Sequence, residues 1–148
     1  MYFKGKGTIK INEQIIDLEK VGNVVALPVD DINSISFSNI DKVTTIENLT
    51  TFYDYKDEGL TIYLGGFPTK NQLNILKKIY NDNIKFYHFG DIDYGGFTIL
   101  NYLFENVSQN IKTINMNLET LKNNIKYCST IDNKDYLIKL HKLLDKEY

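Results

Sequence analysis

The sequence predicts an α/β domain in which helices flank a mainly parallel sheet of four strands. From residue 42 onward, short β-branched segments alternate with segments whose apolar residues recur at helical spacing. Such alternation is typical of parallel strands joined by helical crossovers. Residues before this point lack the alternation and favour strands. We therefore expect a β-rich N-terminal extension over residues 1–41 and the α/β domain over residues 42–148.

The N-terminal extension contains patterns for a hairpin and an edge strand. Two strand-like segments, 8–11 and 15–18, flank the turn-like Asn12–Glu13. The apolar run at 24–29 includes Pro28, which cannot donate a hydrogen bond to a neighbouring strand and so favours a sheet edge.

The α/β region contains patterns for four strands and four helices. We expect the strands at residues 43–46, 60–64, 84–89 and 111–114. Thr69 and Gln72 form a capping box at the start of the first helix, because each side chain can bond the other's backbone amide. The later helices are expected from near Gly96, over 118–125, and from about 133 with Asp132 as N-cap.

Bulk composition narrows the classes of function. The chain has 148 residues, 43% of them hydrophobic, which suits one compact domain with a buried core. A formal net charge of -2 argues against a basic nucleic-acid binder, so DNA affinity would need a local patch, a cation or another chain. Cys128 is the only cysteine, which excludes a disulfide framework. No apolar run approaches the roughly 20 residues of a membrane span, so we expect a cytoplasmic protein without membrane contact.

Three acidic residues follow predicted strands and form the candidate site. Glu47 follows the first strand of the α/β region, and Asp91 and Asp93 follow the third. The carboxyl ends of parallel strands share one edge of a sheet, so the three carboxylates can converge. Converging carboxylates repel one another unless a cation or a shared proton compensates. Oxygen-only ligands favour Mg²⁺ or Mn²⁺, and the three acids are therefore candidate metal ligands and catalytic groups.

Glycines and one lysine flank the predicted strand ends, where a phosphate could approach. Gly95 and Gly96 follow the aspartates at the start of a helix, whose free amides and positive dipole end favour anions. Gly65 and Gly66 follow the second strand, and Lys70 lies in the first turn of the next helix. These five residues are candidates for contact with a phosphate group.

Each of these features also has a structural explanation. An Asp-x-Asp pair is common in turns and at helix N-caps, and a glutamate after a strand is often a surface residue. His88 and His141 lie in a predicted strand and an amphipathic helix, which favours packing or surface roles over metal ligation. No tyrosine stands out as a nucleophile. The prediction of a metal site therefore depends on the three acids and the flanking glycines taken together.

Three segments resemble the C-terminal domain of the nuclease subunit, the D component, of Wadjet plasmid-defence systems. They are Thr45–Phe52 (TIENLTTF), Tyr63–Pro68 (YLGGFP) and Phe89–Leu100 (FGDIDYGGFTIL). The resemblance implies a Toprim-like domain over 42–148, distantly similar to the A subunit of type IIB topoisomerases. It also implies that Glu47, Asp91 and Asp93 act in Mg²⁺- or Mn²⁺-dependent cleavage of double-stranded plasmid DNA.

The resemblance further implies condensin-like defence-complex subunits as partners and leaves room for a homodimer. Members of the family carry N-terminal arm and winged-helix-like regions, so this chain is expected to be an excised domain. In the related topoisomerases the nucleophilic tyrosine lies on a winged-helix domain. Without such a domain, cleavage by this chain would be hydrolytic.

Two other functions remain open on the sequence. The domain could be a non-catalytic assembly or DNA-docking module of the same complex, which the net charge of -2 would fit. It could also be another Asp-x-Asp phosphate enzyme, such as a haloacid-dehalogenase-type phosphatase or a nucleotide-sugar transferase. The phosphatase pattern has a Gly-Thr-type turn directly after its second aspartate, whereas Tyr94 and Gly95 follow Asp93 here.

Overall fold

The main sheet contains the predicted parallel strands. The computed structural model describes residues 1–144, with the side chains of Ile32 and Leu144 left undescribed. Strand order in the main sheet is β4-β1-β7-β6-β8-β9. Four neighbouring strands run parallel: β7 (Leu60–Tyr63), β6 (Lys42–Ile46), β8 (Lys85–Phe89) and β9 (Lys112–Thr113). The predicted α/β class and its parallel strands are confirmed.

The N-terminal segment adds two antiparallel strands to this sheet. β1 (Tyr2–Gly5) pairs with β7, placing Phe3 opposite Ile62, and β4 (Val25–Ala26) pairs with the other side of β1. β4 lies at the sheet edge, as the proline after it favours. Residues of the predicted extension therefore belong to the same sheet as the α/β region.

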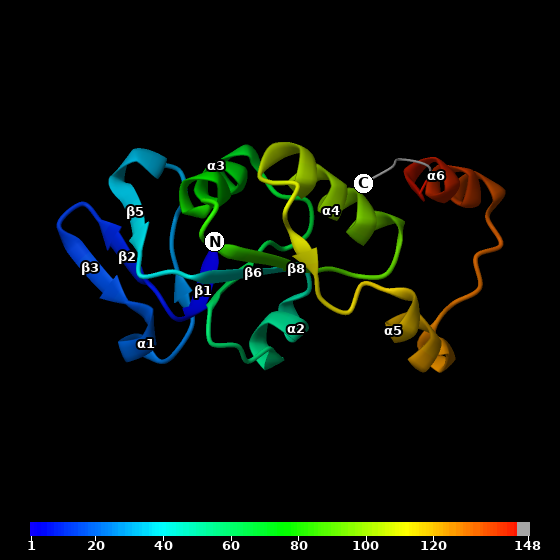
Figure 1. Ribbon diagram of the computed structural model, residues 1–148, viewed down its shortest axis with the longest axis horizontal. Helices are drawn as coiled ribbons and strands as arrows, with labels where there is room; N and C mark the ends of the chain where they lie inside the picture. The colour runs from blue at the N-terminus through cyan, green and yellow to red at the C-terminus, as the bar shows by residue number, and fades with distance from the viewer. Residues whose placement is uncertain (145–148) are drawn as a thin grey trace.

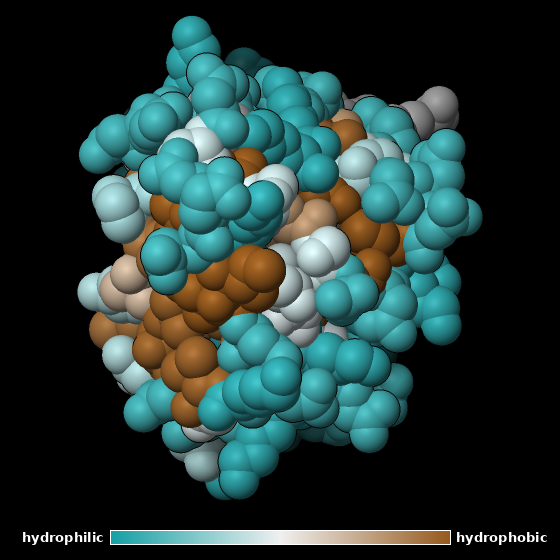
Figure 2. Space-filling model, turned by 90° about the vertical axis from the view of Figure 1, so that its left-hand side faces the viewer, coloured by the Kyte–Doolittle hydropathy of each residue, from teal (hydrophilic) through white to brown (hydrophobic). Residues whose placement is uncertain are grey.

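A smaller antiparallel sheet packs at the N-terminal end of the molecule. Its strand order is β3-β2-β5, from β3 (Gln14–Asp17), β2 (Thr8–Ile11) and β5 (Ile35–Ser38). The predicted hairpin is thus confirmed. The short helices α1 (Leu18–Val21) and η1 (Ile32–Ser34) connect this sheet to its neighbours. Figure 2 shows apolar side chains gathered at this end of the molecule, where Ile15 and Val21 are exposed.

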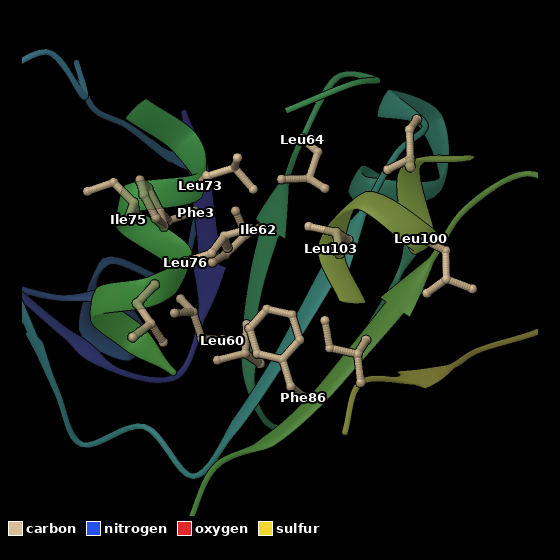
Figure 3. Close-up of a cluster of buried hydrophobic side chains, with 14 of the residues drawn as sticks. Phe3, Leu60, Ile62, Leu64, Leu73, Ile75, Leu76, Phe86, Leu100 and Leu103 are labelled. Atoms are coloured by element: carbon tan, nitrogen blue, oxygen red, sulfur yellow. The ribbon is translucent and has the colours of Figure 1, made fainter. Parts of the chain in front are cut away.

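Helices cover both faces of the main sheet. α3 (Lys70–Ile79) and α4 (Tyr94–Asn106) lie on one face, and α2 (Leu49–Asp54) lies on the other (Figure 1). Apolar residues between α3, α4 and the sheet form the largest part of the core (Figure 3). They include Phe3, Leu60, Ile62, Leu64, Leu73, Leu76, Phe86, Leu100 and Leu103. Burial of such side chains stabilises a fold by about 1.5–3 kcal/mol each before entropy is counted.

Local capping fixes where these helices begin. The capping box at Thr69 and Gln72 is confirmed, with Thr69 accepting from the Gln72 amide and Gln72 from the Thr69 amide. α4 begins at Tyr94, two residues before the predicted start, because the Asp93 carboxylate already bonds the Gly96 amide.

The C-terminal helices leave most of their residues exposed. α5 (Leu118–Asn123) is shorter than expected and is followed by the turn η2 (Ile125–Tyr127), and α6 (Lys134–Leu144) contacts α4. The prediction that Asp132 caps α6 is wrong. Asn133 caps it instead, because its Oδ1 accepts from the amides of Asp135 at 2.9 Å and Tyr136 at 3.1 Å. None of the helices in residues 1–144 has the length and apolarity needed to cross a membrane.

Candidate functional site

Backbone pairing brings Glu47 to the loop that carries the two aspartates. β6 and β8 are paired so that Ile46 lies opposite Phe89, and the Glu47 amide donates to the Phe89 carbonyl at 3.1 Å. The Glu47 carboxylate then accepts a hydrogen bond from the Asp91 amide through Oε2 at 3.2 Å. Glu47 and Asp91 therefore meet at the carboxyl edge of the parallel strands, 44 positions apart in the chain.

Strand periodicity explains why Glu47 turns towards this loop. Alternate residues of a strand point to the same face, so Thr45 and Glu47 share a face of the sheet. Thr45 lies opposite His88 in the pairing of β6 with β8, and Gly90 follows His88 by two residues. Glu47 therefore lies on the same face of the sheet as His88, and this face ends at Gly90.

The two aspartates differ in what their side chains bond. The Asp93 carboxylate is the N-cap of α4, accepting from the Gly96 amide through Oδ1 at 2.8 Å. The Asp91 side chain is exposed and makes no hydrogen bond within the described residues. In residues 1–144, no three Asp, Glu, His or Cys side chains are arranged so that they could hold a metal ion.

The pKa of the Glu47 carboxyl is raised above its ordinary value. Partial burial is the main cause, because it disfavours the charged form. The charges of Asp91 and Asp93 raise the pKa further, and the Asp91 amide partly offsets this by stabilising the carboxylate. The three acids are therefore close enough to influence one another electrostatically.

The oxygen atoms of the three acids suit a hard divalent cation, but the three side chains do not surround a site for one. The acids offer only oxygen atoms, which Mg²⁺ and Mn²⁺ prefer. A cation beside Glu47 would compensate the repulsion that raises its pKa. Enclosing an ion would require the exposed Asp91 side chain to turn, and Asp93 to use the oxygen that does not cap α4.

The Gly65–Gly66 turn lies at the same edge of the sheet as Glu47. The Leu64 amide donates to the Ile46 carbonyl at 2.9 Å, which holds the end of β7 beside the end of β6. Gly65 and Gly66 have φ of 73° and 101°, values that favour glycine. Lys70 is exposed at the first residue of α3. Their predicted contact with phosphate remains a prediction.

Gly95 and Gly96 differ in their surroundings. Gly96 is buried, and a side chain there would collide with the carbonyl of Asp91, so close packing alone requires glycine. Gly95 is exposed, and a Cβ there would approach only the Asp93 carboxylate, at 3.2 Å. Of the two, Gly95 has the more accessible backbone for an incoming phosphate.

Two residues beside the acids have roles that the sequence did not predict. His88 is fully buried, and its Nδ1 lies 2.9 Å from the Thr45 hydroxyl. Tyr136 of α6 accepts a hydrogen bond from the Tyr94 amide at 2.9 Å, which places its hydroxyl at the start of α4. Strand alternation could have indicated that His88 points inward with Phe86. No local pattern could have paired Tyr136 with Tyr94.

Comparison with known sequences places the chain in a family of Wadjet proteins. The sequence model for the family "Wadjet protein JetD, C-terminal" matches residues 9–148. The chain therefore belongs to the family of JetD C-terminal domains.

A relative in Bacillus cereus (strain Q1), described as Wadjet protein JetD, is 31% identical to this chain over 156 aligned positions. The match covers 99% of the chain and 38% of the relative. The chain thus spans well under half the length of that protein.

Proposed function

We propose that this domain provides the DNA-cleaving site of a Wadjet-type anti-plasmid defence complex, acting by metal-dependent phosphodiester hydrolysis. The proposal rests chiefly on the contact between the Glu47 carboxylate and the Asp91 amide, 3.2 Å apart, at the carboxyl edge of the parallel strands. Membership of the JetD C-terminal family supports the same function. We further propose that the domain is Toprim-like.

Each acid has a distinct role in the proposed chemistry. Asp91 is exposed and unbonded, so it would be the first ligand for Mg²⁺ or Mn²⁺. Asp93 would add a ligand from the start of α4, and Glu47 would be a general base or a further ligand. The bound ion would lower the pKa of water and stabilise negative charge on the phosphate. The raised pKa makes the Glu47 carboxylate a stronger base than an ordinary carboxylate.

The charge of the chain indicates that other subunits hold most of the DNA. The formal net charge is -2, and double-stranded DNA is strongly anionic. We therefore propose condensin-like subunits of the defence complex as partners that bring plasmid DNA to Lys70 and the glycine turns. Because partner subunits would hold most of the DNA, the isolated chain should bind DNA weakly.

Plasmid nicking tests the catalytic proposal. Supercoiled plasmid is incubated with the chain and Mg²⁺ or Mn²⁺, and nicked circles are quantified for wild type, Glu47→Gln, Asp91→Asn and Asp93→Asn. Asp93→Asn keeps the side-chain oxygen that caps α4 and removes the negative charge, so it tests the charge alone. Removing a ligand or base should lower the rate at least 100-fold. The exposed Glu58→Gln is the matched control and should nick at the wild-type rate.

Equal nicking by wild type and all three site variants would refute the catalytic role of the acids. Because partner subunits are proposed to bind the DNA, the assay is repeated with these subunits present. Absence of nicking in that complete assembly would refute the nuclease proposal itself.

An assembly module is the second candidate function. Its support is the set of exposed apolar residues in the C-terminal part: Leu118, Ile125, Tyr127, Ile131 and Ile138. Exposed apolar side chains suit contact with another protein where they gather in one patch. The use of the Asp93 carboxylate as a helix cap also fits this function. Absence of Mn²⁺ binding at millimolar concentration would favour the assembly module over the nuclease.

A further inference from the structure

A buried histidine beside Glu47 has one ring nitrogen without a hydrogen-bond partner among the described residues. His88 is 0% exposed, and its Nε2 bonds to no group in residues 1–144. A buried polar atom without a partner costs about 1–3 kcal/mol, so such atoms usually bond a buried water or serve a function. His88 is not one of the three acids of the proposed nuclease site, yet its Nε2 and the Glu47 carboxylate lie on the same side of Gly90.

The Thr45 hydroxyl lies between the Tyr87 carbonyl and one ring nitrogen of His88. Thr45 Oγ1 donates to the Tyr87 carbonyl at 3.2 Å and lies 2.9 Å from His88 Nδ1. This pair of contacts suits the tautomer in which Nδ1–H donates to the hydroxyl oxygen, since the hydroxyl has a single hydrogen. In that tautomer Nε2 is unprotonated and can accept a hydrogen bond. Burial also lowers the pKa of His88 to about 4, which keeps the ring neutral.

The missing side chain of Gly90 would point between this nitrogen and Glu47. A Cβ at Gly90 would lie 2.8 Å from His88 Nε2, 3.0 Å from Glu47 Oε2 and 3.3 Å from Met116 Cε. His88 Nε2 and Glu47 Oε2 therefore border the same side of Gly90, beside the terminal methyl group of Met116. A water that bridges the two atoms would donate one hydrogen to each, a role that no described side chain fills for Nε2.

We propose that His88 is a positioning residue, whose Nε2 accepts a hydrogen bond from a buried water shared with Oε2 of Glu47. The bridge fixes the Glu47 carboxylate, which also accepts from the Asp91 amide. Its role in DNA cleavage rests on the proposed nuclease function, but the bridge itself does not. Residues that orient a reacting or ligating group in this way typically change activity 10- to 100-fold when replaced.

Nitrogen-15 NMR of the labelled chain tests the bridge without any activity measurement. We expect the Nδ1–H tautomer at pH 7, with Nε2 unprotonated and hydrogen-bonded. Glu47→Gln should shift the Nε2 resonance because it changes one partner of the shared water, whereas Glu58→Gln should leave it unmoved. An Nε2–H tautomer, or an Nε2 resonance indifferent to Glu47→Gln, would overturn the proposal.

A pair of His88 variants tests the consequence for cleavage. Gln can place an acceptor oxygen near the position of Nε2, whereas Asn can keep only the contact with Thr45. In the complete assembly, His88→Asn should slow plasmid nicking about 10-fold with unchanged DNA affinity, and His88→Gln should restore most of the rate. Equal rates for the two variants would contradict positioning through Nε2. Loss of nicking by wild type would instead refute the nuclease proposal and leave the NMR result to decide the bridge.

Discussion

At the scale of single residues, the acidic site depends on what each carboxylate already bonds. Glu47 accepts from the Asp91 amide, Asp93 caps α4, and the Asp91 side chain is left exposed. The sequence could predict that these three residues lie at one sheet edge, because the strand ends determine it. It could not predict which carboxylate caps the helix, since Asp-x-Asp offers two candidates within three positions.

His88 should make the stability of the domain fall in mild acid. Its pKa is lowered from 6.5 to about 4 by burial, so the unfolded chain takes up a proton that the folded chain refuses. The contribution to stability is therefore fully present above pH 6.5 and is lost as pH falls towards 4. The difference between pH 7.5 and pH 5 should be about 2 kcal/mol.

Urea unfolding at pH 7.5 and pH 5 measures this effect in wild type and in His88→Gln, which does not titrate. The variant should have the smaller loss of unfolding free energy in acid. Glu47 acts in the opposite direction: because its pKa is raised, its contribution is present at low pH and is lost as pH rises through that pKa. Identical acid sensitivity of wild type and His88→Gln would contradict a buried neutral imidazole.

At the scale of elements, α4 links the aspartates to the C-terminal part of the chain. Asp93 begins the helix, and α6 contacts it through the hydrogen bond from the Tyr94 amide to the Tyr136 hydroxyl. Helix periodicity predicted α4 and α6 from the sequence. Their contact was not predictable, because hydrogen bonds between residues 42 positions apart leave no local pattern.

Replacing Tyr136 with Phe should loosen α6 from the start of α4. The variant keeps the ring that packs against Tyr94 but removes the hydroxyl that accepts from the Tyr94 amide. We expect faster hydrogen exchange at the Tyr94 amide and a stability loss of about 1 kcal/mol. The matched control is Tyr127→Phe, since Tyr127 is 75% exposed. Unchanged exchange at Tyr94 in the Tyr136 variant would contradict the contact.

At the scale of the whole molecule, the N-terminal segment is part of the sheet that builds the site. β1 pairs with β7 over four residues, and Phe3 is buried in the core beneath α3 (Figure 3). The sequence pattern of residues 1–41 predicted strands and the hairpin of β2 and β3, but not the pairing of β1 with β7. Strand pairing between β1 and β7 depends on the three-dimensional path of the chain, and the change at residue 42 marks only where helices begin to alternate with strands.

A fragment comprising residues 42–148 should therefore fold poorly. Its β7 would lose β1 and present an unpaired edge with exposed apolar residues, which favours aggregation. Size-exclusion chromatography and thermal unfolding should give aggregates or an unfolded chain, whereas residues 1–148 should unfold cooperatively. A monomeric fragment with a cooperative transition would contradict the shared sheet and would make residues 1–41 a separable extension.

We expect Glu47, Asp91 and Asp93 to bind one or more divalent ions at the carboxyl edge of the sheet. A crystal of the chain soaked in Mn²⁺ tests it directly through the anomalous signal of the ion. Density should appear between the Glu47 carboxylate and the aspartates, with ligand oxygens at about 2.0–2.6 Å and the Asp91 side chain turned inward. Saturating Mn²⁺ without density there, with Asp91 still turned to solvent, would show that the three acids do not form a metal site.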